Sequence, residues 1–203
     1  MRVAIVGGPG IGKSTLVRQL ADLYHHGAYG EGEEGVWDPR VLEDIEAGRN
    51  PVGVTAYFAR LYDANYRDAA RHDHPARVMF IEGARITLEA HIAEYPAAHH
   101  ARLREVLTIG DHWNPDRTIV LTSNTDTIEK HIRLRNRANE NVELMIDRFR
   151  LIDDAFRRLA PRYPGTVVFN RDHREFHTRG ALLEIIAAAD LPPFEEVVYE
   201  RMD

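Results

Sequence analysis

The sequence predicts an α/β fold in which a mostly parallel central sheet is covered by helices. A short apolar strand candidate opens the chain, a glycine-rich turn follows it directly, and helical hydrophobic spacing begins after the turn. Farther along, apolar strand candidates alternate with amphipathic segments, the order expected for parallel strands between layers of helices. The 203 residues contain no repeat and no linker-like segment, so we expect a single domain over residues 1–203.

The strand candidates are short apolar runs that occupy residues 2–6, 77–81, 118–122 and 166–169. The helix candidates occupy residues 13–24, 39–48, a segment that starts at 51, 86–107, a segment around 128–133, 140–159 and 181–189. Asp38 before Pro39 is a suitable N-cap, and Pro96 interrupts the fourth helix candidate. Residues 25–37 are rich in Gly and Glu and predict an irregular loop.

The composition narrows the function classes. The chain has no cysteine, which excludes disulfides, thiolate catalysis and cysteine-bound zinc. No apolar run approaches the roughly 20 residues that span a bilayer, and the first apolar run reaches glycines too soon for a signal peptide. We therefore expect an intracellular, cytoplasmic protein without a membrane partner. The net charge of −6 argues against a general nucleic-acid-binding surface but leaves a local basic cleft for DNA open.

The strongest motif is Gly7-Gly8-Pro9-Gly10-Ile11-Gly12-Lys13-Ser14, which fits G-x-x-x-x-G-K-[ST]. Glycines let successive backbone N–H groups turn inward around phosphates, and the next helix aims its positive end at the same place. Lys13 reaches the β- and γ-phosphates, and the Ser14 hydroxyl binds Mg²⁺. The apolar strand before the motif and the amphipathic helix after it make a chance match improbable. The expected fold is therefore of the P-loop NTPase type.

Glu82 follows the second strand candidate. Ligands of parallel sheets sit at the carboxyl ends of the strands, so Glu82 can face Mg²⁺ or act as a base. The alternative is an ordinary polar strand end, and position alone favours the functional interpretation by about two to one.

Two further charged runs allow two interpretations each. Arg133, Arg135 and Arg137 supply positive charge for phosphoryl transfer, or they form a solvated helix end, and spacing alone favours neither. In the stretch 31–34, a carboxylate can accept a proton from an acceptor hydroxyl. Without further context, a solvated acidic loop is the better interpretation of that stretch.

Together these residues resemble the deoxynucleoside kinase and thymidylate kinase group of P-loop kinases. The resemblance covers most of the chain in the family's order. It runs through the P-loop, the acidic stretch before Trp37, the strand that ends at Glu82, the arginine-rich run 131–140 and the loop after the last strand. The resemblance implies ATP and Mg²⁺ as cofactors, an arginine-bearing helical lid at about 131–142, and a homodimer. It also raises the odds for functional lid arginines to about four to one.

The resemblance assigns roles to three sets of residues. The catalytic set is Lys13, Glu31, Glu33, Arg85, Arg133, Arg135 and Arg137. The nucleotide-binding set is Gly8, Gly10, Ile11, Gly12, Lys13, Ser14, Thr15, Arg133 and Asp172. The acceptor-binding set is Trp37, Tyr57, Glu82, Arg85 and Glu140. Ser14 and Glu82 hold the metal, and Glu31 and Glu33 compete for the role of base.

The sequence departs from the family pattern at three places, one of which is the absent Glu–Pro pair of the base loop. Gly83 stands where the family has an arginine directly after the strand-end carboxylate, and Arg85 is the nearest substitute. The segment 51–60 has no glutamine to read a base, and Thr55 is the nearest position. The chain is also similar to ribosylnicotinamide kinase and related small P-loop ATPases, mainly in the P-loop and the segment 57–82.

The sequence therefore predicts a Mg²⁺- and ATP-dependent kinase for a nucleoside or deoxynucleoside. The nearest rival is a nucleoside monophosphate kinase of the thymidylate type, which needs a further cation from Arg85, Arg40 or Arg60. Other rivals are a kinase of a modified base in DNA, a ribosylnicotinamide kinase-like enzyme, and a nucleotide-sensing NTPase with slow, acceptor-independent turnover.

Overall fold

A computed structural model describes residues 1–31, 37–72, 74, 77–135, 141–172, 174–176 and 178–194. At its centre lies a five-stranded sheet with the order β2-β3-β1-β4-β5. The strands are β1 (Arg2–Gly7), β2 (Ala28–Tyr29), β3 (Met79–Glu82), β4 (Arg117–Thr122) and β5 (Thr166–Asn170). Each neighbouring pair of these strands is parallel, which confirms the expected α/β fold.

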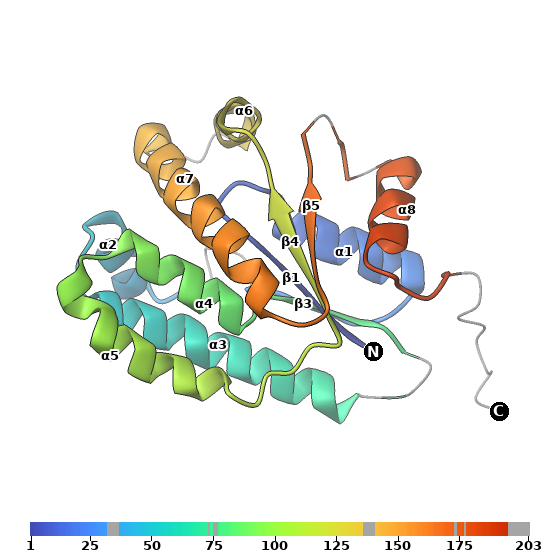
Figure 1. The fold of residues 1–203 in the computed structure, drawn as a ribbon, viewed down its shortest axis with the longest axis horizontal. Coiled ribbons are helices and arrows are strands. Elements are labelled where there is room, and N and C mark those ends of the chain that lie inside the picture. Colours follow the sequence, from blue (N-terminus) through green and yellow to red (C-terminus); the bar gives the residue numbers. More distant parts are fainter. Residues whose placement is uncertain are drawn as a thin grey trace.

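The helices lie on both faces of this sheet (Figure 1). They are α1 (Lys13–Tyr24), α2 (Pro39–Glu46), α3 (Pro51–Arg71), α4 (Arg85–His91), α5 (Ala97–Leu107), α6 (Thr125–Arg135), α7 (Val142–Leu159) and α8 (Arg179–Ala188). No helix within the described ranges combines the length and the apolarity that a bilayer crossing requires.

The alternation of β1 explains the two helical layers. Val3 and Ile5 pack on one face with α1 and α8, and Ala4 and Val6 pack on the other face with α4 and α7. All four side chains are fully buried, as expected for a central parallel strand. A third apolar cluster joins β3 to α3 and α5, and so anchors the helices that flank one side of the sheet.

Two sequence expectations are corrected at the level of secondary structure. The stretch 25–37 was expected to be irregular, but Ala28–Tyr29 forms β2 by pairing with β3 (Ala28 beside Phe80). The fourth helix candidate is two helices, α4 and α5, with a short 3-10 turn (Ile92–Glu94) before Pro96. Proline has no N–H for the helical ladder, which explains the break.

The sheet topology positions the site. β1 and β3 are parallel neighbours, with Ile5 beside Glu82, so the turn after β1 and the carboxylate that ends β3 meet at one edge. One side of the turn is occupied by β2, β3, α2, α3 and α4 (Figure 1). The other side is occupied by β4, β5 and α6. A ligand at this edge therefore has two distinct sides.

Candidate functional site

The glycine-rich turn leads directly into the first helix. Gly12 has φ +93° and α1 begins at the next residue, Lys13. The Lys13 ammonium donates a hydrogen bond to the Gly8 carbonyl at 3.5 Å. The N-terminal end of α1 and its backbone N–H groups therefore face the same space as the lysine, the arrangement that binds phosphate.

The turn is supported from the β5–α8 connection. Arg171 is buried, and its guanidinium donates to the Ile11 carbonyl and lies 4.4 Å from the centre of the Phe176 ring. A Cβ added at Gly12 would lie only 2.5 Å from Nη1 of Arg171. The arginine thus packs directly against the turn, and any side chain at position 12 would displace it.

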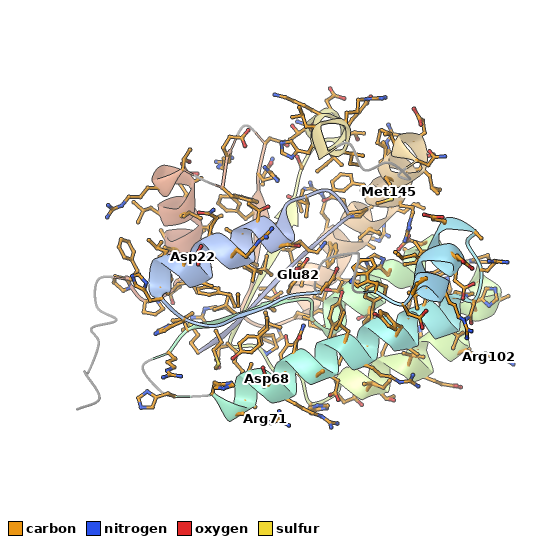
Figure 2. All side chains as sticks on the ribbon, turned by 180° about the vertical axis from the view of Figure 1, so that it is seen from behind. Asp22, Asp68, Arg71, Glu82, Arg102 and Met145 are labelled. Atoms are coloured by element: carbon orange, nitrogen blue, oxygen red, sulfur yellow. The ribbon has the colours of Figure 1, made fainter. Side chains whose placement is uncertain are left out.

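A cavity of about 1500 Å³ opens above the turn. Its floor includes Gly10, Gly12, Lys13, Ser14 and Thr15, five of the residues that the sequence assigned to the nucleotide. Two of the assigned residues, Gly8 and Ile11, do not line it. The Gly8 carbonyl accepts a hydrogen bond from Lys13, and Ile11 is fully buried in the core. Figure 2 shows Glu82 near the middle of the molecule and Met145 on α7, and both line this cavity.

Lys13, Ser14 and Glu82 converge on the floor of the cavity. The Ser14 hydroxyl donates to Glu82 Oε1 at 3.0 Å, and the Lys13 Nζ lies 3.9 Å from the same oxygen. Only 2% of Glu82 is exposed. Burial and the Glu31 carboxylate raise the pKa of Glu82, while Lys13 and Ser14 oppose the shift. A cation at this point would favour the charged form of this buried carboxylate.

Glu31 is held beside Glu82 by an aromatic residue. The Tyr62 hydroxyl donates to the Glu31 carboxylate, and the Glu31 N–H donates to Glu82 Oε2 at 3.4 Å. Burial, with the Glu31 charge, raises the pKa of Tyr62 well above its ordinary value, so the phenol remains a donor. The Trp37 indole donates to the Glu31 carbonyl at 2.8 Å. Glu33, the rival base, lies outside the described residues.

The surroundings of Gly83 leave no room for a side chain at that position. The φ of Gly83 is +93°, and a Cβ there would lie 2.5 Å from Cζ of Tyr62. The space that a side chain at position 83 would need is therefore filled by the ring that holds Glu31. Arg85, the nearest substitute, pairs with Asp111 and does not line the cavity.

Gly83→Ala is expected to destabilise the fold by about 3 kcal/mol, from a left-handed backbone (about 1–2 kcal/mol) and overpacking against Tyr62 (about 1–3 kcal/mol). The loss in the free energy of unfolding is measured by urea unfolding followed by circular dichroism. Gly48→Ala is the matched control, because Gly48 also has positive φ (+61°) but nothing lies within 4 Å of its added Cβ. Equal losses in the two variants would contradict the role of the Tyr62 ring.

The side of the cavity next to β3 has aromatic and apolar walls. Phe58 packs edge-on against Trp37, with 5.1 Å between the ring centres, and both line the cavity. Val54, Thr55 and Leu88 line the same side. Tyr57 lies outside this wall, where its hydroxyl accepts a hydrogen bond from the Asp38 N–H at 3.4 Å. An aromatic and apolar wall of this kind suits a planar ring.

The side next to β4 and β5 carries polar and charged groups. This side of the cavity is lined by Arg18, His131, Arg171 and Glu175. Asp172 does not line it, because its carboxylate accepts from the Ser123 hydroxyl and, at 2.8 Å, from the Asn124 N–H. It therefore ties the loop after β5 to the start of α6, next to the segment that lines the cavity.

The lid arginines are only partly described. Arg133 is 55% exposed, pairs with Glu129 at 2.7 Å, and does not line the large cavity. Arg137 and Glu140 lie outside the described residues, as does the side chain of Arg135. The catalytic roles of these groups stay predictions.

A buried carboxylate orders two cavity residues at the far end of the β3 side. Glu94, whose side chain is 6% exposed, contacts both Nδ1 of His91 and Nε of Arg148. His91, Tyr95 and Arg148 line the cavity there. Burial alone would raise the pKa of Glu94, but His91 and Arg148 outweigh it and hold that pKa at about 2. The carboxylate is therefore ionised and keeps both partners in place.

Glu94→Gln is expected to lower the free energy of unfolding by about 3 kcal/mol at pH 7, since one pKa unit corresponds to about 1.4 kcal/mol. A depressed pKa stabilises the fold fully above the unfolded value of 4.5, and the contribution is lost as pH falls toward the folded value of about 2. The difference between the parent and the variant should shrink over that window. Urea unfolding of both proteins at several pH values measures this difference in the free energy of unfolding.

Glu129→Gln is the matched control for this experiment. Glu129 also pairs with an arginine, but on an exposed helix surface, where the expected cost is at most about 1 kcal/mol. A loss in Glu94→Gln no larger than in this control would contradict the buried role of Glu94.

Several residues of the site were missed from the sequence. Tyr62 is part of a buried apolar cluster, and nothing in the sequence indicated that its hydroxyl also holds Glu31. Arg148 lies in a helix with several other arginines, so nothing in its spacing distinguishes it. The i, i+3 spacing of His91 and Glu94 on one helical turn was the available signal for the far cluster.

No protein-family model and no curated protein sequence matches the chain. Its structure is similar to three structures of deoxyadenosine kinase from M. mycoides. They contain dCTP, the products dCMP and a flexible dCDP, and dATP, respectively. The TM-scores are 0.67, 0.68 and 0.66, the identities 13%, 14% and 14%, and the coverage 92–94% of this chain and 97–99% of theirs. At these identities the similarity confirms the fold that the resemblance implied.

Proposed function

We propose that this chain is a kinase that transfers the γ-phosphate of ATP to a hydroxyl of a nucleoside or deoxynucleoside. One observation carries the proposal: a single cavity joins a phosphate-binding turn to an aromatic compartment, with Glu31 and Glu82 at the junction. A nucleotide on the floor and a planar acceptor against the aromatic wall would meet at these two carboxylates. The fold similarity to deoxyadenosine kinase supports the same reaction class.

The chain's own residues divide the work of in-line transfer. The turn and Lys13 hold the β- and γ-phosphates, and Lys13 stabilises the charge that develops on the moving phosphoryl group. Glu31 accepts the proton of the acceptor hydroxyl while the hydroxyl oxygen of the acceptor forms a bond to the γ-phosphorus. The bond from that phosphorus to the β–γ bridging oxygen breaks, and ADP leaves. Tyr62 keeps the Glu31 carboxylate aimed at the acceptor.

The residues on the floor fit Mg²⁺. The Ser14 hydroxyl oxygen and a Glu82 carboxylate oxygen lie 3.0 Å apart, and oxygen ligands are those that Mg²⁺ prefers. When bound with ATP, the ion neutralises charge on the β- and γ-phosphates. Within the described residues no cluster of three metal-ligating side chains occurs, which is consistent with a site completed by phosphates and water.

The geometry favours a nucleoside over a monophosphate acceptor. An acceptor phosphate would need its own cation near the floor, and the candidates were Arg85, Arg40 and Arg60. Arg85 pairs with Asp111, and the other two are exposed and do not line the cavity. Arg148 does line the far end of this side, but its charge is already paired with Glu94. The junction carries two carboxylates instead, which would repel a phosphate.

The proposal is tested by measuring ADP release in the presence of ATP and Mg²⁺ with a panel of candidate acceptors. The panel contains nucleosides, deoxynucleosides, their monophosphates, nicotinamide riboside and single-stranded DNA. The same panel on Lys13→Ala gives the background. Stimulation by nucleosides that is lost in the variant supports the proposal. Stimulation by monophosphates or DNA alone, or slow turnover that no acceptor changes, would refute it in favour of the corresponding rival.

A further inference from the structure

Arg148 enters the cavity with part of its guanidinium already occupied. Its Nε contacts Glu94, and its side chain is 19% exposed. No described residue accepts a hydrogen bond from Nη1 or Nη2. Since an arginine presents its donors in a rigid planar fork, anchoring Nε also sets the direction of the two Nη groups.

This fork lies at the acceptor's end of the cavity. Arg148 comes from α7, and its neighbours in the lining, His91 and Tyr95, come from α4 and the turn after it. α4 and the 3-10 turn (Ile92–Glu94) lie on the β3 side with the aromatic wall, and Arg148 reaches them from α7 through its contact with Glu94. The glycine-rich turn and Lys13 form the floor. An acceptor whose hydroxyl points to Glu31 would therefore direct its other end, the base, toward Arg148.

The local charge favours a neutral partner. The Glu94 carboxylate, whose pKa is held at about 2, balances the guanidinium charge within a buried contact. Because Glu94 already pairs with this guanidinium through Nε, Arg148 offers two directed donors whose positive charge is offset locally. A second anion here would leave an uncompensated charge in a partly buried place, which is costly. Neutral lone-pair acceptors are the chemistry that fits.

We propose that Arg148, positioned by Glu94, reads the acceptor's base by donating two parallel hydrogen bonds to two neighbouring acceptor atoms. This inference rests on the proposed function, which makes the ligand a nucleoside. The chemistry selects 6-oxopurines, through O6 and N7, and cytosine, through O2 and N3. It disfavours adenine, where an amino donor stands beside N7, and thymine, whose two carbonyls flank an N–H.

Calorimetric binding of deoxyguanosine, deoxyinosine, deoxycytidine, deoxyadenosine and thymidine tests this without phosphoryl transfer. We expect at least one of the first three to bind about 10-fold or more tighter than the last two, as one bidentate contact contributes about 1–3 kcal/mol. If deoxyguanosine is preferred, 7-deazadeoxyguanosine, which lacks N7, should lose most of the advantage. If deoxycytidine is preferred, Arg148 donates to O2 and N3 of cytosine.

Arg148→Lys keeps the charge beside Glu94 but removes the fork, and should reduce the preference to about threefold or less. Glu94→Gln should also reduce it, and because this preference is a ratio between ligands, a merely structural loss would leave it unchanged. Arg150→Lys is the matched control, two residues farther on α7, 58% exposed and paired with Asp147. It should leave the preference intact.

The outcomes separate this inference from the proposed function. A preference for deoxyadenosine or thymidine, or one that Arg148→Lys does not change, overturns the base-reading role even if nucleosides stimulate ADP release. The expected preference without any nucleoside-dependent ADP release supports base reading and overturns the kinase proposal. Failure of every nucleoside to bind overturns the base-reading role.

Discussion

Replacing Lys13 with alanine is expected to lower kcat for acceptor-dependent ADP release by about 10²–10³-fold, as removal of a preorganised electrostatic contact does. The lysine lies between the Gly8 carbonyl and Glu82 on the cavity floor. A compact ammonium at that point compensates charge that grows as the phosphoryl group moves, so the loss should fall on kcat more than on KM. Steady-state rates over a range of ATP concentrations measure the split.

The chain offers an unusually clean control for this experiment. Its only other lysine is Lys130, which is exposed on α6. Lys130→Ala should keep the parent rate, so that a general effect of losing a lysine is excluded. Comparable rates for the parent and Lys13→Ala, with both proteins folded, would remove the main support for phosphoryl transfer at the turn.

Glu31→Gln is expected to lower kcat by about 10²–10⁴-fold, the range for loss of a positioned general base. Glutamine has nearly the same shape, and its carbonyl oxygen can still accept the Tyr62 hydrogen bond, so the local geometry should persist. Acceptor binding should change little, because the carboxylate is needed for the proton and not for the aromatic wall. Single-turnover rates, with binding measured separately, test this.

Two matched variants sharpen the test. Glu46→Gln makes the same change on α2, at the edge of the same cavity, and should leave kcat near that of the parent. Glu33→Gln addresses the other carboxylate that the sequence left in competition. A larger loss in Glu33→Gln than in Glu31→Gln would move the role of base to Glu33.

The phosphate-binding floor could be predicted from the sequence because its determinants are local. Eight consecutive residues, a strand before them and a helix after them specify both the shape and the chemistry of the turn. The carboxylate at Glu82 was also predictable, since parallel strands end at a common edge. Both inferences needed only the order of elements along the chain.

The acceptor end could not be predicted in the same way because its determinants are distant in sequence. Glu31 gains its position from Tyr62 on α3, and Arg148 gains its direction from Glu94, which lies 54 residues earlier in the chain. β2 forms only because β3 lies beside it, since two residues have no strand pattern of their own. The resemblance pointed to arginines, but Arg85 and Arg133 do not line the cavity.

The contact between Gly83 and Tyr62 also constrains how this protein can evolve. An arginine introduced at position 83 alone would collide with the tyrosine ring, and a smaller residue at position 62 alone would release Glu31. Each single step is therefore expected to be deleterious. The two positions are expected to be epistatic, because the effect of a substitution at one depends on the residue at the other.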